Sequence, residues 1–436
     1  MFKKLSVSAA AIISLASLSF AAVNFDGPQA GSLMEEIKGV DVPAAVPADK
    51  GLLSWLSSLR TKEWTIMVYI NGKNNLEKFA LKDMNEMELV GSSDKVNVVV
   101  EVGRMEGFDS SDGDWKGTRR YLITKDTDTE KVNSTMVQDL GKTDMGDYKN
   151  VAAFGKWAKA KYPSKKTMLV IWNHGAGWVK SRSFAGSTKG ISYDDETNNH
   201  INTPQMGALL KDMGGVDVYG SDACLMQMAE VVYEIKNYVP YIVGSEETEP
   251  GDGYTYNDLL APLVAKPTMT AEEFGKVAVS AYSDHYAGIN EGSTQSLIRS
   301  AAIPGFLAAA DEFAGAVTKA GEKELAKTSM GAAQAYAYPE NKDLYHFAQL
   351  MVAGTKDAEV KAKGEALMSY IKDTLVVINK TTNGAGGGWW APPADYTNSH
   401  GIAVYLPGAA VPAAYNELQW ARYSGWDEFI NWLAQP

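Results

Sequence analysis

Cysteine is scarce in this sequence: Cys224 is the single cysteine among 436 residues. One cysteine cannot form a disulfide within the chain, nor a zinc site built from several thiolates. Positive charge is also in deficit, because 41 Lys and Arg face 53 Asp and Glu and give a net charge of −12 at pH 7. Nucleic-acid binding needs a basic face that displaces counterions, so we exclude that function. The 45% hydrophobic content predicts a folded protein with a core.

The N-terminus has the parts of a secretory signal peptide. Lys3 and Lys4 form its basic start, residues 5–18 are apolar, and Ala21 ends a small-residue cleavage motif. We therefore expect removal of residues 1–21 and export to the periplasm or the extracellular space. A membrane anchor is the alternative, but the apolar run is short for a span and contains several serines. No later stretch is apolar enough to cross a bilayer, so we expect no membrane anchor in the mature protein.

Strand patterns alternate with helical patterns from Trp64 onward. Compact apolar runs predict buried strands at 64–70, 96–102, 167–172 and 216–220. This alternation is typical of an α/β fold with a mostly parallel sheet sandwiched by helices. We expect four parts, which are the signal peptide at 1–21, a linker or prosegment at 22–60, a core at 61–265, and a helix-rich C-terminal part at 266–436 that contributes a late strand near 401–406.

Two polar motifs follow two of these strands, at the point where each strand ends. The first, WNHG at 172–175, contains His174, and the second, GSDAC at 220–224, ends on Cys224. If the strands are neighbours, about 5 Å apart, both side chains open into one crevice at the carboxyl edge of the sheet. The thiol could then act as a nucleophile and the imidazole as its base or as the proton donor to a leaving amine. An inert buried cysteine and a hydrogen-bonded histidine are the ordinary alternatives.

The segment after Cys224 predicts a helix that begins at once, because apolar residues recur at helical spacing from Leu225 to Ile235. The positive end of such a helix would stabilise a thiolate. The backbone N–H groups of Gly175 and Cys224 could bind the oxyanion of a tetrahedral intermediate.

Several short motifs, taken in order, resemble those of the clostripain-like cysteine peptidases. They are WTIMVYI at 64–70, NNLE at 74–77, NEM at 85–87, WNHG at 172–175, DACLM at 222–226, GSEE at 244–247, GY at 253–254 and GIAVYLP at 401–407. Each motif is weak alone, but together they span most of the chain. The resemblance implies a caspase-like sheet, a dyad of His174 and Cys224, and an exported cysteine endopeptidase that forms a thioester acyl-enzyme.

The same resemblance implies cleavage after Arg or Lys, so the partners would be proteins or peptides that contain these residues. Binding a long cation needs recessed carboxylates, and the family pattern places them at Asp222 and Asp252. A carboxylate so close to a thiol raises the thiol pKa, so Asp222 suits substrate binding better than activation. Lys73 departs from the family, which usually has an acidic or small polar residue at that position.

Family members often cut themselves between the two dyad residues. Lys180, Arg182 and Lys189 are candidate processing sites in a polar loop, although an ordinary solvated loop or a removable prosegment at 22–60 would also fit. The sequence requires no cofactor and assigns no metal ligands, while calcium stays open because some family members use it. Two other functions stay open as well, a catalytically silent binding module on the same scaffold and a transpeptidase that uses the same acyl-enzyme.

Overall fold

The computed structural model describes residues 61–178, 190–385 and 394–436. These residues fall within one compact unit, Arg60–Pro436. The expected signal peptide and linker at 1–60 lie outside the described residues, as do the candidate processing sites Lys180, Arg182 and Lys189. None of the helices in the described ranges is long and apolar enough to cross a membrane.

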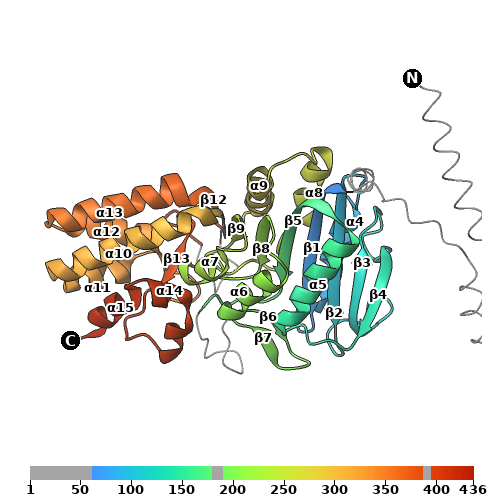
Figure 1. Cartoon of the computed structure of the whole chain (residues 1–436), viewed down its shortest axis with the longest axis horizontal. Coiled ribbons are helices and arrows are strands. Elements are labelled where there is room, and N and C mark those ends of the chain that lie inside the picture. The colour runs from blue at the N-terminus through green and yellow to red at the C-terminus, as the bar shows by residue number, and fades with distance from the viewer. Residues whose placement is uncertain (1–60, 179–189, 386–393) are drawn as a thin grey trace, which may run out of the picture. The chain divides into compact units, whose positions relative to one another are not determined.

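A nine-stranded sheet forms the centre of the described part of the chain (Figure 1). In spatial order its strands are β12 (Val376–Thr382), β10 (Ser293–Arg299), β9 (Tyr241–Gly244), β8 (Val218–Asp222), β5 (Ser164–Trp172), β1 (Lys62–Gly72), β2 (Val96–Arg104), β3 (Gly117–Leu122) and β4 (Thr135–Gly141). The strands from β9 to β2 are parallel, and the strands at both edges are antiparallel. The four strands predicted from apolar runs, β1, β2, β5 and β8, lie side by side in the parallel centre, where both faces are covered.

Two hydrophobic cores lie on opposite faces of this sheet. Helices α5 (Tyr148–Lys161), α6 (Thr203–Asp212) and α7 (Ala229–Ile235) cover one face, while α4 (Glu77–Glu88), α8 (Tyr256–Ala265) and α9 (Ala271–Ile289) cover the other. Successive residues of β1 alternate between the cores, with Met67 and Tyr69 on the first face and Ile66 and Val68 on the second. The predicted fold class, a mostly parallel sheet sandwiched by helices, is confirmed.

The C-terminal part is rich in helix and also extends the central sheet. Its helices are α10 (Ile303–Ala320), α11 (Lys323–Ala332), α12 (Leu344–Gly354), α13 (Ala358–Tyr370), α14 (Gln419–Tyr423) and α15 (Trp426–Ala434), with short helical turns at Ser300–Ala302, Ile371–Leu375 and Ala413–Glu417. Figure 1 shows α10 to α13, in yellow to orange, side by side near β12.

The strand expected near 401–406 is β13 (Ala403–Tyr405), and it pairs with β11 (Asn341–Asp343) outside the central sheet. The strands that the C-terminal part adds to the central sheet are instead β10 and β12. Sequence reasoning missed β12 because this strand is only half-buried along its whole length and carries no compact apolar run.

Candidate active site

The carboxyl ends of β5 and β8 bring the two polar motifs together. These strands pair in parallel, with Trp172 opposite Asp222, so His174 and Cys224 each lie two residues beyond the last pair of the ladder. Both side chains line one cavity of about 720 Å³. The two strands are therefore neighbours, which is the condition for a shared crevice, and their pairing explains how residues distant in the sequence share a cavity.

Other walls of the cavity come from loops at the same edge of the sheet. Asn75 follows β1, Phe108 follows β2, Thr248 follows β9, and Ala337 and Tyr338 precede β11. The hairpin of β6 (Ile191–Asp194) and β7 (Asn199–Ile201) supplies Tyr193, Asp195 and Asn198. The cavity thus joins polar groups at its centre to aromatic side chains on its walls, which is the usual make-up of a binding site.

Asn75 contacts the histidine directly. The His174 Nε2 atom lies 2.7 Å from the Asn75 Oδ1 atom, and burial lowers the pKa of the imidazole. In the sequence, Asn74 and Asn75 stood out only as part of the NNLE motif at 74–77, with no role assigned to either. Asn74 does serve the turn, since its Oδ1 atom accepts the N–H of Leu76 at 3.0 Å, whereas Asn75 orients the histidine. Polar residues at the end of a central strand were the signal that could have found this role.

The Cys224 thiol is neutral in this environment. Burial raises its pKa to about 12, and the nearby carboxylates of Glu249 and Glu247 act in the same direction. One contact opposes them, because the backbone N–H of Glu249 donates a hydrogen bond to the Cys224 Sγ atom at 3.3 Å. Burial lowers the pKa of the histidine as well, so the surroundings of the resting pair favour a thiol and a neutral imidazole over a thiolate and an imidazolium.

The helix expected directly after Cys224 is absent, and that prediction was wrong. Helix α7 begins only at Ala229, and Leu225 has a left-handed backbone with φ of 63°. The N–H groups of Leu225 and Gln227 donate to the carbonyls of Glu247 and Ser245 at 3.0 and 2.9 Å. Because these N–H groups pair with the segment after β9, no helix dipole points at the thiol.

The backbones of Gly175 and Cys224 are in close contact. A Cβ atom at Gly175 would lie 2.4 Å from the carbonyl oxygen of Cys224, so only glycine fits there. Gly175 and Cys224 both line the cavity, so their backbones border the space that a substrate would enter.

The two acidic residues expected to bind substrate have different surroundings. Asp222 is 4% exposed and accepts hydrogen bonds from the Tyr254 N–H at 3.1 Å and the Tyr256 hydroxyl at 2.7 Å. Burial raises its pKa to about 7. The carboxylate of Asp252 instead pairs with Lys82 at 2.6 Å and His285 at 3.3 Å. Substrate binding by either residue stays a prediction.

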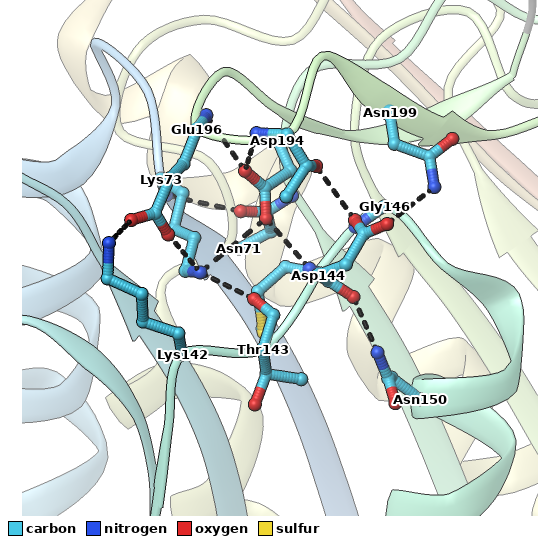
Figure 2. Close-up of polar contacts among 12 residues, drawn as sticks. Asn71, Lys73, Lys142, Thr143, Asp144, Gly146, Asn150, Asp194, Glu196 and Asn199 are labelled. Carbon is cyan, nitrogen blue, oxygen red and sulfur yellow. Dashed lines mark hydrogen bonds and ion pairs between the residues drawn. The ribbon is translucent and has the colours of Figure 1, made fainter.

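Lys73, the departure noted in the sequence, is completely buried and paired with acids (Figure 2). Its Nζ atom lies 2.7 Å from Glu196 Oε2 and 3.7 Å from Asp194 Oδ2, and it donates a hydrogen bond to the carbonyl of Thr143. Asp194 also accepts the N–H groups of three residues, Met145, Glu196 and Thr197, at 2.8 to 3.0 Å. Lys73 therefore fastens the β6–β7 hairpin to the end of β1.

Asp144 adds a second set of contacts to the same hairpin. Its two carboxylate oxygens accept hydrogen bonds from Thr197 Oγ1 at 2.9 Å and Asn199 Nδ2 at 2.7 Å, as Figure 2 shows for Asn199. Since Tyr193, Asp195 and Asn198 line the cavity, this polar cluster, built around the buried Lys73 and Asp194, fixes one of its walls. Within the described ranges, no group of three or more His, Cys, Asp or Glu side chains is placed to hold a metal ion.

A caspase-like sheet that carries a histidine and a cysteine at the ends of neighbouring strands is typical of one class of cysteine peptidases. Comparisons with known proteins point to the same class. The model of the clostripain family matches residues 68–432, so the chain belongs to the clostripain family. It is 27% identical to clostripain from Hathewaya histolytica over 227 residues, which cover 47% of this chain. The match spans only 43% of the length of that relative.

Two solved structures share the fold. A secreted C11 cysteine protease from Bacteroides thetaiotaomicron superposes with a TM-score of 0.63 at 18% identity, covering 85% of this chain and 99% of that one. An inactive zymogen C11 protease from Parabacteroides distasonis gives a TM-score of 0.62 at 17% identity, covering 83% of this chain and 98% of that one. At these identities the likeness establishes the fold.

Proposed function

We propose that the protein is an exported cysteine endopeptidase that hydrolyses peptide bonds after Arg or Lys. The observation that carries this proposal is the placement of His174 and Cys224 in one cavity, with the imidazole held by Asn75. Membership of the clostripain family supports the reaction type. The acidic Asp222 behind Cys224 supports the preference for a cation.

The resting protonation states favour general-base attack over a preformed ion pair. With Nε2 bonded to the Asn75 carbonyl oxygen, Nδ1 is the imidazole nitrogen that takes the thiol proton as sulfur attacks the substrate carbonyl carbon. The N–H groups of Gly175 and Cys224 stabilise the oxyanion. The imidazolium then returns its proton to the leaving amine as the C–N bond breaks, which leaves a thioester on Cys224. Water, deprotonated by the same histidine, hydrolyses the thioester and frees the thiol.

The test compares the wild-type protein with Cys224→Ala on short peptides with Arg, Lys, Asp or Asn before the cut bond. We expect cleavage of the Arg and Lys peptides by the wild type and none by the variant. Equal activity in both proteins would refute the dyad, and cleavage only after Asp or Asn would refute the cationic specificity. An amine acceptor added to the reaction distinguishes a transpeptidase, because it would then appear joined to the product.

Self-processing and export form the second half of the proposal. The described residues on either side of 179–189 are tied together beside the histidine, since Ala176 N–H donates to Gly190 O at 2.9 Å and Ser192 N–H to His174 O at 3.3 Å. A chain cut after Lys180, Arg182 or Lys189 would keep both flanking segments at the site. N-terminal sequencing of active protein should give one start at Ala22 and a second within 181–190. A single intact chain would refute self-processing, and a start at Met1 would refute removal of the signal.

A further inference from the structure

An exposed aromatic side chain, that of Phe108, lies on the wall of the cavity that contains the dyad. Phe108 is 48% exposed. Within the described ranges, three other large apolar residues are exposed to a similar or greater degree, and none of them lines this cavity, namely Met136, Ile289 and Tyr423. Single exposed apolar residues are ordinary on a protein surface. One that borders a candidate active site is instead placed to contact a substrate.

The loop that carries Phe108 is held in place by a buried ion pair. The guanidinium of Arg104 and the carboxylate of Glu77 are both completely buried and lie 2.7 Å apart. Arg104 Nη2 donates to the carbonyl of Asp109 at 3.0 Å, and the N–H of Asp109 donates to Glu77 Oε2 at 3.2 Å. Because both backbone groups of the residue after Phe108 are held, a ligand that contacts the ring has little loop entropy to remove.

One turn of the chain positions both this loop and the histidine. Glu77 is the first residue of α4. Two residues earlier, Asn75 places its Oδ1 atom 2.7 Å from His174 Nε2. The segment 75–77 therefore contacts the imidazole and the loop at once, and it fixes the position of Phe108 relative to the dyad.

The order of the strands places Phe108 beyond the histidine as seen from the nucleophile. Along the sheet the order is β9, β8, β5, β1 and β2. Cys224 follows β8, His174 follows β5 and Phe108 follows β2, all at the carboxyl edge. Neighbouring strands lie about 4.8 Å apart, so the end of β2 is about 10 Å beyond the end of β5, a distance that an extended peptide covers in about three residues.

The chemistry of the proposed reaction gives the bound substrate a direction. The Sγ atom of Cys224 bonds to the carbonyl carbon, while His174 gives its proton to the amine nitrogen of the same peptide bond. The C–N bond that breaks must therefore point from the end of β8 toward the end of β5. The leaving peptide begins on the histidine side of the cavity, which is the side of Phe108.

We infer that Phe108 binds an apolar side chain of the substrate within the first three residues after the cut bond. This inference rests on the proposed function, because it assigns a subsite for the leaving peptide of that reaction. An apolar side chain removes water-exposed area when it packs on the ring, and an aromatic one also gains edge-to-face or offset contact. The contact lasts only until the leaving peptide departs, so it favours formation of the thioester and does not act on its hydrolysis.

Peptides that differ only after the cut bond test this inference. Each has Arg before the bond and either Phe or Ser at the first, second or third position after it. A coumarin amide of arginine, which has no residue after the bond, measures the proposed activity alone. The wild-type protein should prefer Phe over Ser at one of the three positions by about two- to twelvefold in kcat/KM, the worth of one aromatic pair. Phe108→Ala should abolish this preference, and Phe108→Leu should retain part of it.

Two matched variants separate the subsite from general damage. Met136→Ala removes an equally exposed apolar side chain outside the cavity and should leave the preference unchanged. Tyr338→Ala changes the cavity on the nucleophile side, where the neighbouring Ala337 donates its N–H to Glu247 Oε1 at 2.9 Å. It should also preserve the Phe-over-Ser ratio, whatever it does to the overall rate.

The ratio of the two peptides is the decisive measurement, because a partly misfolded variant lowers both rates equally. A wild-type preference below about twofold at all three positions overturns the inference. A preference that persists in Phe108→Ala, or that is lost in Tyr338→Ala and not in Phe108→Ala, overturns it as well. If the wild-type protein cuts neither the arginine peptides nor the coumarin amide, the proposed function itself is refuted.

Discussion

Replacement of Lys73 by methionine should destabilise the protein and loosen one wall of the cavity. Methionine fills much of the same volume but carries no charge, so Asp194, whose side chain is fully buried, loses its cation. The nearest acid, Glu196, loses its 2.7 Å contact but is 27% exposed and keeps Lys142 at 3.2 Å. The main cost of Lys73→Met therefore falls on Asp194.

The magnitude follows from these contacts. Removing one partner of a buried ion pair costs about 3–5 kcal/mol. Asp194 retains hydrogen bonds from three backbone N–H groups, which still stabilise its charge, so we expect the lower end, about 3 kcal/mol. The double variant Lys73→Met with Asp194→Asn leaves no buried unpaired charge. It should recover at least about 1 kcal/mol relative to the sum of the two single variants.

Urea unfolding of the four proteins in a Cys224→Ala background measures this cycle without interference from self-cutting. The same substitutions in active protein should raise KM more than they lower kcat, because the hairpin that Lys73 holds supplies Tyr193, Asp195 and Asn198 to the cavity and not the nucleophile. A loss below about 0.5 kcal/mol for Lys73→Met, or strict additivity in the cycle, would refute the role of the buried pair.

Three further predictions concern the dyad. Asn75→Ala removes a hydrogen bond to His174 worth about 0.5–1.5 kcal/mol, so kcat/KM should fall about two- to twelvefold; an unchanged value would mean that other contacts orient the ring. Alkylation of Cys224 by iodoacetamide should rise about tenfold per pH unit from pH 7 to 9, because its pKa is raised to about 12; a plateau below pH 8 would reveal a thiolate–imidazolium pair. Gly175→Ala places a Cβ atom 2.4 Å from the Cys224 carbonyl oxygen and should lower kcat at least about a hundredfold, whereas Gly288→Ala, with open space around it, should not.

The local pattern of the sequence was enough to predict the four strands at the parallel centre of the sheet. Strand β2 is a compact apolar run and is buried along its whole length. A strand that is covered on both faces needs such a run, whichever strands lie beside it. Because parallel strands all end at the same edge, polar motifs after β5 and β8 had to lie at one edge of the sheet, and the pairing of these two strands makes the motifs neighbours. The edge was located for His174 and Cys224 without knowledge of any contact.

Side-chain partners depend on residues far away in the sequence, and only the tertiary structure decided them. The polar residue that holds His174 is 99 positions away, and the acids that hold Lys73 are more than 120 positions away. The periodicity after Cys224 predicted a helix there, yet the backbone of this segment pairs with the segment after β9 instead. Apolar spacing records which side chains are buried, but it does not record which acceptor each N–H group will find.

For the single cysteine, the sequence determined its position in the fold, and the tertiary structure determined its protonation. Its sequence context, directly after a central strand, determined that Cys224 lies at the carboxyl edge of the sheet beside a histidine. The protonation of its thiol depended instead on burial and on the carboxylates of Glu247 and Glu249, which a distant loop brings to it. Electrostatic free energies depend on separation in space and on exclusion of water, and neither quantity exists until the chain is folded.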